Sequence, residues 1–185
     1  MTPNEYLSIM KSLMDKSDEK QLEAAVDLIY ETMINKKTVF VAGNGGSAAT
    51  ANHFAADFGK NVVLGDEGRP RVMSLCNDAS SITAYANDEG YEKAFYRQMA
   101  NWAGSGDTLI VISASGNSPS VVRAAEFMHS RGGKVIAMTG FGGGRLREIA
   151  DVSLYIDEHR YETVEDTHAV FCHLIVSCVK SRVCA

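Results

Sequence analysis

Short apolar segments alternate with longer amphipathic ones along most of the chain, and this alternation constrains the fold more than any other feature. The apolar segments predict five β-strands, at residues 39–42, 72–76, 109–112, 135–138 and 152–156. The segments after them have helical spacing and predict helices near residues 47–58, 79–103, 118–131, 143–150 and 164–180. Strands that alternate with helices form a parallel sheet covered on both faces. We therefore expect a three-layer α/β fold.

Two further helices are predicted before the first strand. Thr2-Pro3-Asn4-Glu5 is a capping-box pattern with proline at the first helical position. Ser17-Asp18 marks the start of a second helix, in which apolar residues recur at helical spacing. The 185 residues suffice for one domain with a sizeable core, and no linker or repeat interrupts them. We predict a single domain over residues 1–185, in which residues 1–36 form an N-terminal helical extension.

Composition excludes several classes of partner. The net charge of −5 and the absence of any Lys/Arg run argue against nucleic acid. No apolar stretch approaches the roughly 20 residues of a membrane span, and the charged first 30 residues do not resemble a signal peptide. The four cysteines lack the C-x-x-C spacing. We therefore expect a reduced, cytoplasmic protein that binds neither nucleic acid nor membrane.

Ligands of such sheets bind beyond the carboxyl ends of the strands, so the loops there hold the candidate site residues. The first loop is Gly43-Asn44-Gly45-Gly46-Ser47. Glycines let the backbone approach a ligand, and the amides at the start of the next helix favour an anion. Through Ala48 the loop also fits the weak dinucleotide pattern G-x-G-x-x-A, but the chain is short for two nucleotide-binding halves.

A second loop of this kind, VISASGNSPS at residues 111–120, follows the third predicted strand. Ser113, Ser115 and Ser118 offer hydroxyls around a glycine, which suits a phosphate without any lysine or arginine. A purely structural interpretation stays open, in which Ser118 caps the next helix ahead of Pro119 and the other serines only turn the chain. Two hydroxyl- and glycine-rich loops after two parallel strands favour a phosphorylated small ligand.

A third loop, after the second predicted strand, carries the pairs Asn77-Asp78 and Asn87-Asp88. Because Asn and Asp favour caps and turns, local structure is one explanation of each pair. Asn87 and Asp88 can equally end a helix close to the hydroxyls of a sugar.

His53 and Asp57 are four residues apart on a predicted helix and so share a face, which is reached directly from the glycine loop. A histidine and a carboxylate at this spacing can be two ligands of a divalent metal or an acid–base pair. A surface hydrogen bond between them is the simpler alternative.

The segment near the C-terminus holds three more candidates, Glu165, His168 and His173. The two histidines are about 140° apart around a helix and do not naturally share a ligand. Glu165 and His173 are about 80° and about 12 Å apart on a continuous helix. One ion takes both only if Glu165 lies in the loop before the helix, or if the two residues come from different subunits.

With these motifs together, the chain resembles the sugar isomerase (SIS) domain family and, within it, the phosphoheptose isomerase branch. The resemblance runs over nearly the whole length, in the N-terminal helices and in AGNGGSAATANHFA, YANDEGYEKAF, ISASGNS, MTGFGGGRLREIADVSLYI and VEDTHAVFCH. It implies a five-stranded parallel αβα sandwich of flavodoxin-like topology, which forms a homotetramer with active sites at subunit interfaces. It also implies isomerisation of sedoheptulose 7-phosphate to D-glycero-D-manno-heptose 7-phosphate, for bacterial surface-sugar synthesis.

The resemblance also assigns roles to individual residues. The phosphate cradle consists of Ser113, Ala114, Ser115 and Ser118. Other contacts to the phosphosugar come from Asn44, Gly45, Gly46, Ser47, Asn87, Asp88 and Glu165. Zinc ligands are implied at His53, Asp57, Glu165 and His173. Asp57 and His173 also match the general base and acid, which would move a proton between neighbouring carbons through an enediol.

Three positions depart from the family pattern. Asp57 stands where the family has a catalytic glutamate, and one methylene less displaces a base by about an ångström, which can cost roughly 100-fold in rate. Glu165 replaces a glutamine at the metal site and adds negative charge. Ala114 replaces a threonine, although its backbone amide survives. These changes leave open a different metal site or a different phosphosugar.

Two other functions compete with the isomerase. The main one is a non-catalytic protein that binds phosphosugars or associates with the bacterial replication initiator, as some SIS relatives do. Such a protein needs the serine loop but not the residues at 53, 57, 165 and 173, whose presence favours an enzyme. A dinucleotide oxidoreductase is a distant third, because it leaves the serine loop unexplained.

Overall fold

The computed structural model describes residues 1–63 and 68–184. Its centre is a five-stranded sheet, all parallel, in the order β2-β1-β3-β4-β5. The strands are β1 (Thr38–Gly43), β2 (Arg71–Ser74), β3 (Thr108–Ser113), β4 (Lys134–Thr139) and β5 (Val152–Tyr155). This order is that of flavodoxin-like sheets. The predicted strands, their parallel arrangement and the flavodoxin-like topology are confirmed.

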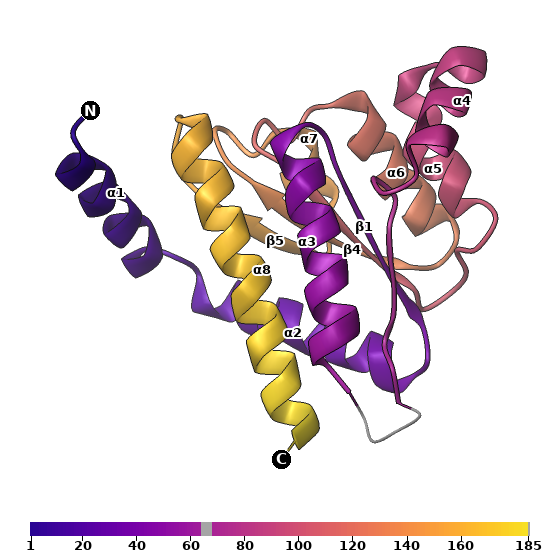
Figure 1. The fold of residues 1–185 in the computed structure, drawn as a ribbon, viewed down its shortest axis with the longest axis horizontal. Coiled ribbons are helices and arrows are strands. Elements are labelled where there is room, and N and C mark those ends of the chain that lie inside the picture. Colours follow the sequence, from indigo (N-terminus) through magenta and orange to yellow (C-terminus); the bar gives the residue numbers. More distant parts are fainter. Residues whose placement is uncertain (64–67, 185) are drawn as a thin grey trace.

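Helices cover both faces of the sheet, as Figure 1 shows. One layer consists of α2 (Glu19–Ile34), α3 (Gly46–Asn61) and α8 (Tyr161–Cys184), with α1 (Pro3–Asp15) packed against α8. The opposite layer consists of α4 (Ala79–Glu89), the 3-10 helix η1 (Tyr91–Lys93), α5 (Ala94–Met99), α6 (Pro119–Ser130) and α7 (Gly144–Ile149). None of the helices in the described residues is long and apolar enough to cross a bilayer.

The strands form this sandwich because their side chains point alternately to the two faces. In β1, Val39 and Val41 pack in the core beneath α2, α3 and α8, whereas Phe40 and Ala42 pack beneath α5 and α6. Ile110 and Leu109 divide in the same way in β3. A strand that is buried on both faces needs apolar residues at every position, which explains the continuous apolar runs in the sequence.

The N-terminal helices begin as predicted. Thr2 and Glu5 form the capping box of α1, and Pro3 is its first residue. Asp18 accepts hydrogen bonds from the amides of Lys20 and Gln21 and so caps α2. Helix α2 buries Leu22, Ala25, Val26, Ile29 and Met33 against the sheet, whereas α1 buries none of its residues.

Two helix boundaries differ from those predicted. The helix expected at 79–103 is interrupted at Gly90, where a φ of 102° ends α4, and the chain continues as η1 and α5. The C-terminal helix begins at Tyr161 rather than 164 and runs to Cys184. No proline or glycine interrupts it, so nothing in the sequence limits it to the shorter apolar stretch.

His168 on α8 is completely buried, and neither of its ring nitrogens has a hydrogen-bond partner among the described residues. Burial lowers the pKa of His168 to about 4, because the imidazolium would lose its hydration. Below the unfolded pKa of 6.5, the unfolded chain therefore takes up a proton that the folded chain does not.

We expect the free energy of unfolding to fall by about 2 kcal/mol between pH 7 and pH 5 because of His168 alone. The measurement is urea unfolding at both pH values, in the wild type and in His168→Gln. The difference between the two pH values should shrink in the variant by that amount. An unchanged difference would mean that His168 is protonated equally in the folded and unfolded chains.

Candidate active site

The strand order changes direction between β1 and β3, because the chain leaves β1 for one side of the sheet and returns to the other. At such a point the loops after the two strands turn apart and leave a crevice at the carboxyl edge. Here these are the glycine loop after β1 and the serine loop after β3. The two loops that the sequence selected thus meet at the place where this fold binds ligands.

A cleft of about 160 Å³ lies between these loops and the start of α8. Its lining consists of Asn44, Ser47, Ile112, Ser113, Ala114, Ser115, Ser118, Tyr161 and Glu165. None of these described lining residues is a lysine or an arginine. The donors that the cleft offers to an anion are side-chain hydroxyls, the Asn44 amide and the backbone amides that begin α3 and α6.

Two of the serines stabilise the turn of the chain, and they still have hydroxyl protons to offer to a ligand. Ser113 and Ser115 accept hydrogen bonds of 3.3 Å from the amides of Gly116 and Asn117, and within the described residues neither hydroxyl has an acceptor for its own proton. Ser118 occupies the N-cap position of α6 but makes no side-chain capping bond, so the capping role considered above is wrong. Three hydroxyl protons thus remain available to a ligand rich in acceptors, such as a phosphate.

The carboxylate of Glu165 lies directly over Gly46. A Cβ at Gly46 would come within 2.5 Å of Oε2 of Glu165. The backbone that opens α3 and the carboxylate from the first turns of α8 are thereby brought together at one end of the cleft. Glu165 lies within the helix, so the alternative that placed it in a preceding loop is wrong.

Three side chains from α3 and α8 converge on the outer seam between these helices. Oδ2 of Asp57 lies 3.2 Å from Nε2 of His53 and 3.5 Å from Nε2 of His173. The two Nε2 atoms lie 3.4 Å apart. Because His173 joins the pair, the arrangement is more than the simple surface hydrogen bond between His53 and Asp57.

These distances fit a small divalent ion. Bonds of about 2.0–2.2 Å in a tetrahedron place the ligand atoms about 3.3–3.6 Å apart, close to the separations of His53, Asp57 and His173. Two imidazoles and a carboxylate supply three ligands, which leaves a fourth position for water or substrate, as in catalytic sites. About half of each imidazole is exposed, so the group can be reached from outside.

Glu165 does not belong to this group of three, whose ligand atoms all lie within 4.8 Å of one another. It lies instead at Gly46, two turns of α8 away from His173. Its position in the cleft accords with its predicted contact to the sugar, whereas its predicted role as a metal ligand stays a prediction. His168 points into the core, so the expectation that it and His173 would not share a ligand is confirmed.

Asn87 and Asp88 lie near the end of α4, exposed, with the Asn87 amide donating to Asp88 over 2.8 Å. They do not line the cleft, and their contact with a sugar stays a prediction. Asn77-Asp78 has the structural role, because Asp78 caps α4 by accepting from the amides of Ser80 and Ser81.

Sequence reasoning missed two residues of the cleft. Tyr161 was placed before the predicted C-terminal helix, and Ile112 was counted only as a strand residue. Two others fix Asn44 without lining the cleft: Tyr91 and Ser120 both hydrogen-bond to its side chain. No local pattern reveals these contacts, because each joins residues at least 47 positions apart.

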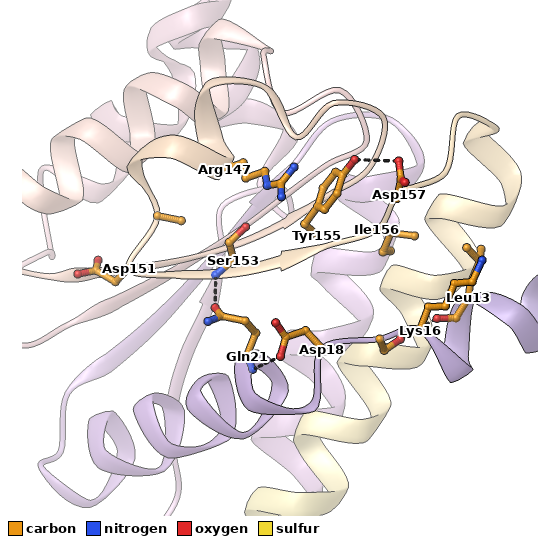
Figure 2. A pocket seen from close by; sticks show the side chains of 12 residues that line it. Leu13, Lys16, Asp18, Gln21, Arg147, Asp151, Ser153, Tyr155, Ile156 and Asp157 are labelled. Atoms are coloured by element: carbon orange, nitrogen blue, oxygen red, sulfur yellow. Dashed lines mark hydrogen bonds between the residues drawn. The ribbon is translucent and has the colours of Figure 1, made fainter.

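A larger cleft, of about 530 Å³, runs along the free edge of β5 between α7 and the turn from α1 to α2 (Figure 2). There the guanidinium of Arg147 lies over the ring of Tyr155, 3.7 Å from its centroid. Asp18 is used as the cap of α2, and Asp157 accepts from the hydroxyl of Tyr155. No predicted site residue lines this cleft, so its size does not make it the active site.

Comparisons with known proteins agree with this arrangement. The family model described as the SIS domain matches residues 4–140. Over 94% of its length the chain is 35% identical to a phosphoheptose isomerase of Helicobacter pylori, of which it covers 88%. A relative of the same name from Mycobacterium bovis is 42% identical over 74% of the chain and 69% of its own length. The phosphoheptose isomerase structure from Neisseria gonorrhoeae superposes with a TM-score of 0.87 at 31% identity, covering 96% of this chain and 94% of that one.

Proposed function

The chain belongs to the SIS domain family and within it to the phosphoheptose isomerases, and from this premise we propose that it interconverts sedoheptulose 7-phosphate and D-glycero-D-manno-heptose 7-phosphate. The reaction moves a carbonyl from C2 to C1 by transfer of a proton between these carbons. The observation that carries the proposal is that α3 and α8 hold both an anion cleft at one end and the group His53, Asp57 and His173 on their shared seam.

In this proposal the phosphate lies against the serine loop. Ser113, Ser115 and Ser118 donate their hydroxyl protons to it, and the amide of Ala114 is available beside them. Glu165 is at the opposite end of the cleft, near Gly46, where a carboxylate repels the phosphate but accepts from sugar hydroxyls. The distribution of charge therefore orients the substrate, with its phosphate at the serine loop and its hydroxyls towards Asn44, Ser47 and Glu165.

The cleft and the group on the seam are separated along α8. Glu165 and His173 are eight residues apart, which is about 12 Å along a helix. We therefore propose that a neighbouring subunit brings a cleft and a group of His53, Asp57 and His173 together on one substrate.

Proton transfer is assigned to Asp57 and His173. A carboxylate takes the proton from C1 of the ketose, and an imidazole can exchange a proton with the adjacent oxygen as the enediol forms and collapses. We propose zinc as the ion at His53, Asp57 and His173, with Glu165 from a neighbouring subunit as a further ligand, and when bound it would supply Lewis-acid polarisation of the sugar carbonyl. If Asp57 is held as a ligand, a water or that Glu165 takes over the role of base.

We also propose that the protein acts in the cytoplasm as a homotetramer with sites at subunit interfaces. Two features support the assembly. In the single chain α1 buries none of its residues, and Leu7 on it is 67% exposed. The imidazoles of His53 and His173 are also half exposed, whereas a metal-assisted site works best when water is largely excluded.

The test is proton NMR of sedoheptulose 7-phosphate in deuterated water, with the metal content of the protein measured beforehand. We expect conversion to the heptose 7-phosphate, entry of solvent deuterium at C2 of the product, and faster conversion with added zinc. Asp57→Asn should abolish both the conversion and the entry of deuterium. The matched control is Asp15→Asn, at an exposed aspartate on α1.

The outcomes separate the candidate functions. Deuterium entry without net conversion would retain the proton chemistry but point to another phosphosugar. Binding of the sugar without exchange, in protein loaded with metal, would contradict the isomerase and favour a non-catalytic phosphosugar-binding protein.

A further inference from the structure

The side chain of Asn44 is held from two sides. Its Nδ2 donates to Oγ of Ser120, 3.0 Å away in the first turn of α6. Its Oδ1 accepts from the hydroxyl of Tyr91 in η1 over 2.7 Å. Ser120 is 2% exposed and cannot follow a ligand, so the Asn44 amide is fixed between the second layer of helices and the cleft that it lines.

Tyr91 is itself held in place by its surroundings. Its ring meets the edge of Phe95, with the centroids 6.1 Å apart, and Phe95 is almost completely buried. The segment around it is tied down by Glu89, which pairs with Arg97 from α5. The hydroxyl therefore reaches Asn44 from a segment that is anchored at Phe95 and Glu89, and 46% of Tyr91 stays exposed.

The hydroxyl of Ser120 also lies 3.3 Å from Oδ1 of Asn44, so it contacts both polar atoms of the amide from one side. Contacts with a single hydroxyl leave rotation about the side-chain torsions possible. The Tyr91 bond is the shortest of these contacts and adds a second point, which determines the orientation of the plane. Oδ1 is occupied by Tyr91, so the remaining Nδ2 proton is the one that Asn44 presents to the cleft.

We propose that Tyr91 is a positioning residue of the sugar site, which orients the Asn44 amide so that its free N–H meets a hydroxyl of the bound phosphosugar. The inference rests on the proposed function, because it takes the occupant of the cleft to be a phosphosugar. Tyr91 acts through Asn44 and does not take part in proton transfer, which involves side chains on α3 and α8. The hydrogen bond from Tyr91 to Asn44 also connects the segment just after Asn87 and Asp88 to the glycine loop.

A bond to the substrate that is equal in the ground state and the transition state changes KM and leaves kcat alone. We therefore expect Tyr91→Phe to raise KM roughly three- to tenfold, the value of one hydrogen bond, with kcat within about twofold of the wild type. The ring is retained, so its packing on Phe95 and the thermal midpoint should be preserved. The matched control is Tyr96→Phe, whose ring packs on Phe127 away from the cleft and whose KM should not change.

Combining Tyr91→Phe with a second substitution, Asn44→Ala, distinguishes a positioning role of Tyr91 from a general structural effect. In Asn44→Ala, the additional change Tyr91→Phe should alter KM by less than about 1.5-fold, because the group through which Tyr91 acts is gone. The inference would be overturned if Tyr91→Phe left KM unchanged, or if it raised KM equally in the wild type and in Asn44→Ala.

The Kd of sedoheptulose 7-phosphate, measured by calorimetry for the wild type, Tyr91→Phe, Asn44→Ala and the double variant, keeps this test separate from that of the proposed function. Binding by the wild type without conversion would contradict the isomerase, while the ratio of Kd values still decides the role of Tyr91. A wild type that neither binds nor converts the sugar would overturn both.

Discussion

Replacing His173 with alanine is expected to lower kcat by roughly 10²–10⁴-fold, the usual contribution of an acid–base group, and to reduce the bound metal to well below one ion per chain. In the proposed metal site His173 is one of three side chains whose polar atoms lie 3.2–3.5 Å apart, and without it two side chains of α3 remain. Two ligands do not hold a divalent ion in a defined geometry. Steady-state kinetics and elemental analysis of the same preparations measure both effects.

The matched control is His129→Ala. His129 also pairs with an aspartate, Asp151 at 2.8 Å, but it lies on α6 in the opposite layer. Its loss should leave kcat and metal content unchanged. Because the side chain of His173 is 55% exposed, its truncation creates no core cavity, and the thermal midpoint should stay within a few degrees of the wild type. A His173→Ala protein with full activity and full metal content would refute the assignment of the site to the seam of α3 and α8.

Gly116→Ala is expected to destabilise the protein by about 2–4 kcal/mol and to raise KM at least about tenfold. Gly116 has a φ of 64°, where a side chain is strained, and a Cβ there would lie 1.9 Å from the carbonyl oxygen of Gly143. The loops after β3 and β4 must therefore move apart. Ser115 and Ser118 flank Gly116, so the hydroxyls that we propose to bind the phosphate move with the loop.

Chemical denaturation measures the free energy of unfolding, and initial rates at a series of substrate concentrations measure KM. Gly142→Ala is the control in the neighbouring loop, because a Cβ there meets nothing within 4 Å. It should change the free energy of unfolding by less than about 0.5 kcal/mol. Equal behaviour of the two variants would show that the close approach of these loops is not needed for the cradle.

Local sequence identifies the elements of this fold well where burial forces the pattern. Strand β1 is apolar from Val39 to Ala42 because both of its faces are covered by helices. The predicted helix at 79–103 was wrong. Asn87, Asp88 and Gly90 are only weak signals of a break, because a helix tolerates each of these residues at a cost of at most about 1 kcal/mol.

Side-chain roles are harder to predict than elements, because they depend on direction and on distant partners. Ser118 has the sequence of a helix cap, but its hydroxyl makes no capping bond to α6. Glu165 matches a position implied for metal binding, yet it lies over Gly46, because helical geometry separates it from His173 by about 12 Å. Neither outcome can be derived from the residues nearest in sequence.

By itself the sequence determined the alternation of strands and helices, the two loops at the carboxyl edge, and the shared face of His53 and Asp57, since each follows from spacing within a few residues. The tertiary structure decided which distant residues these loops and side chains contact. His173 reaches His53 from 120 positions away only because α8 packs beside α3, and Tyr91 reaches Asn44 only because η1 follows the break at Gly90. Such contacts depend on the packing of whole layers, which is set by the sum of many buried apolar side chains rather than by any local motif.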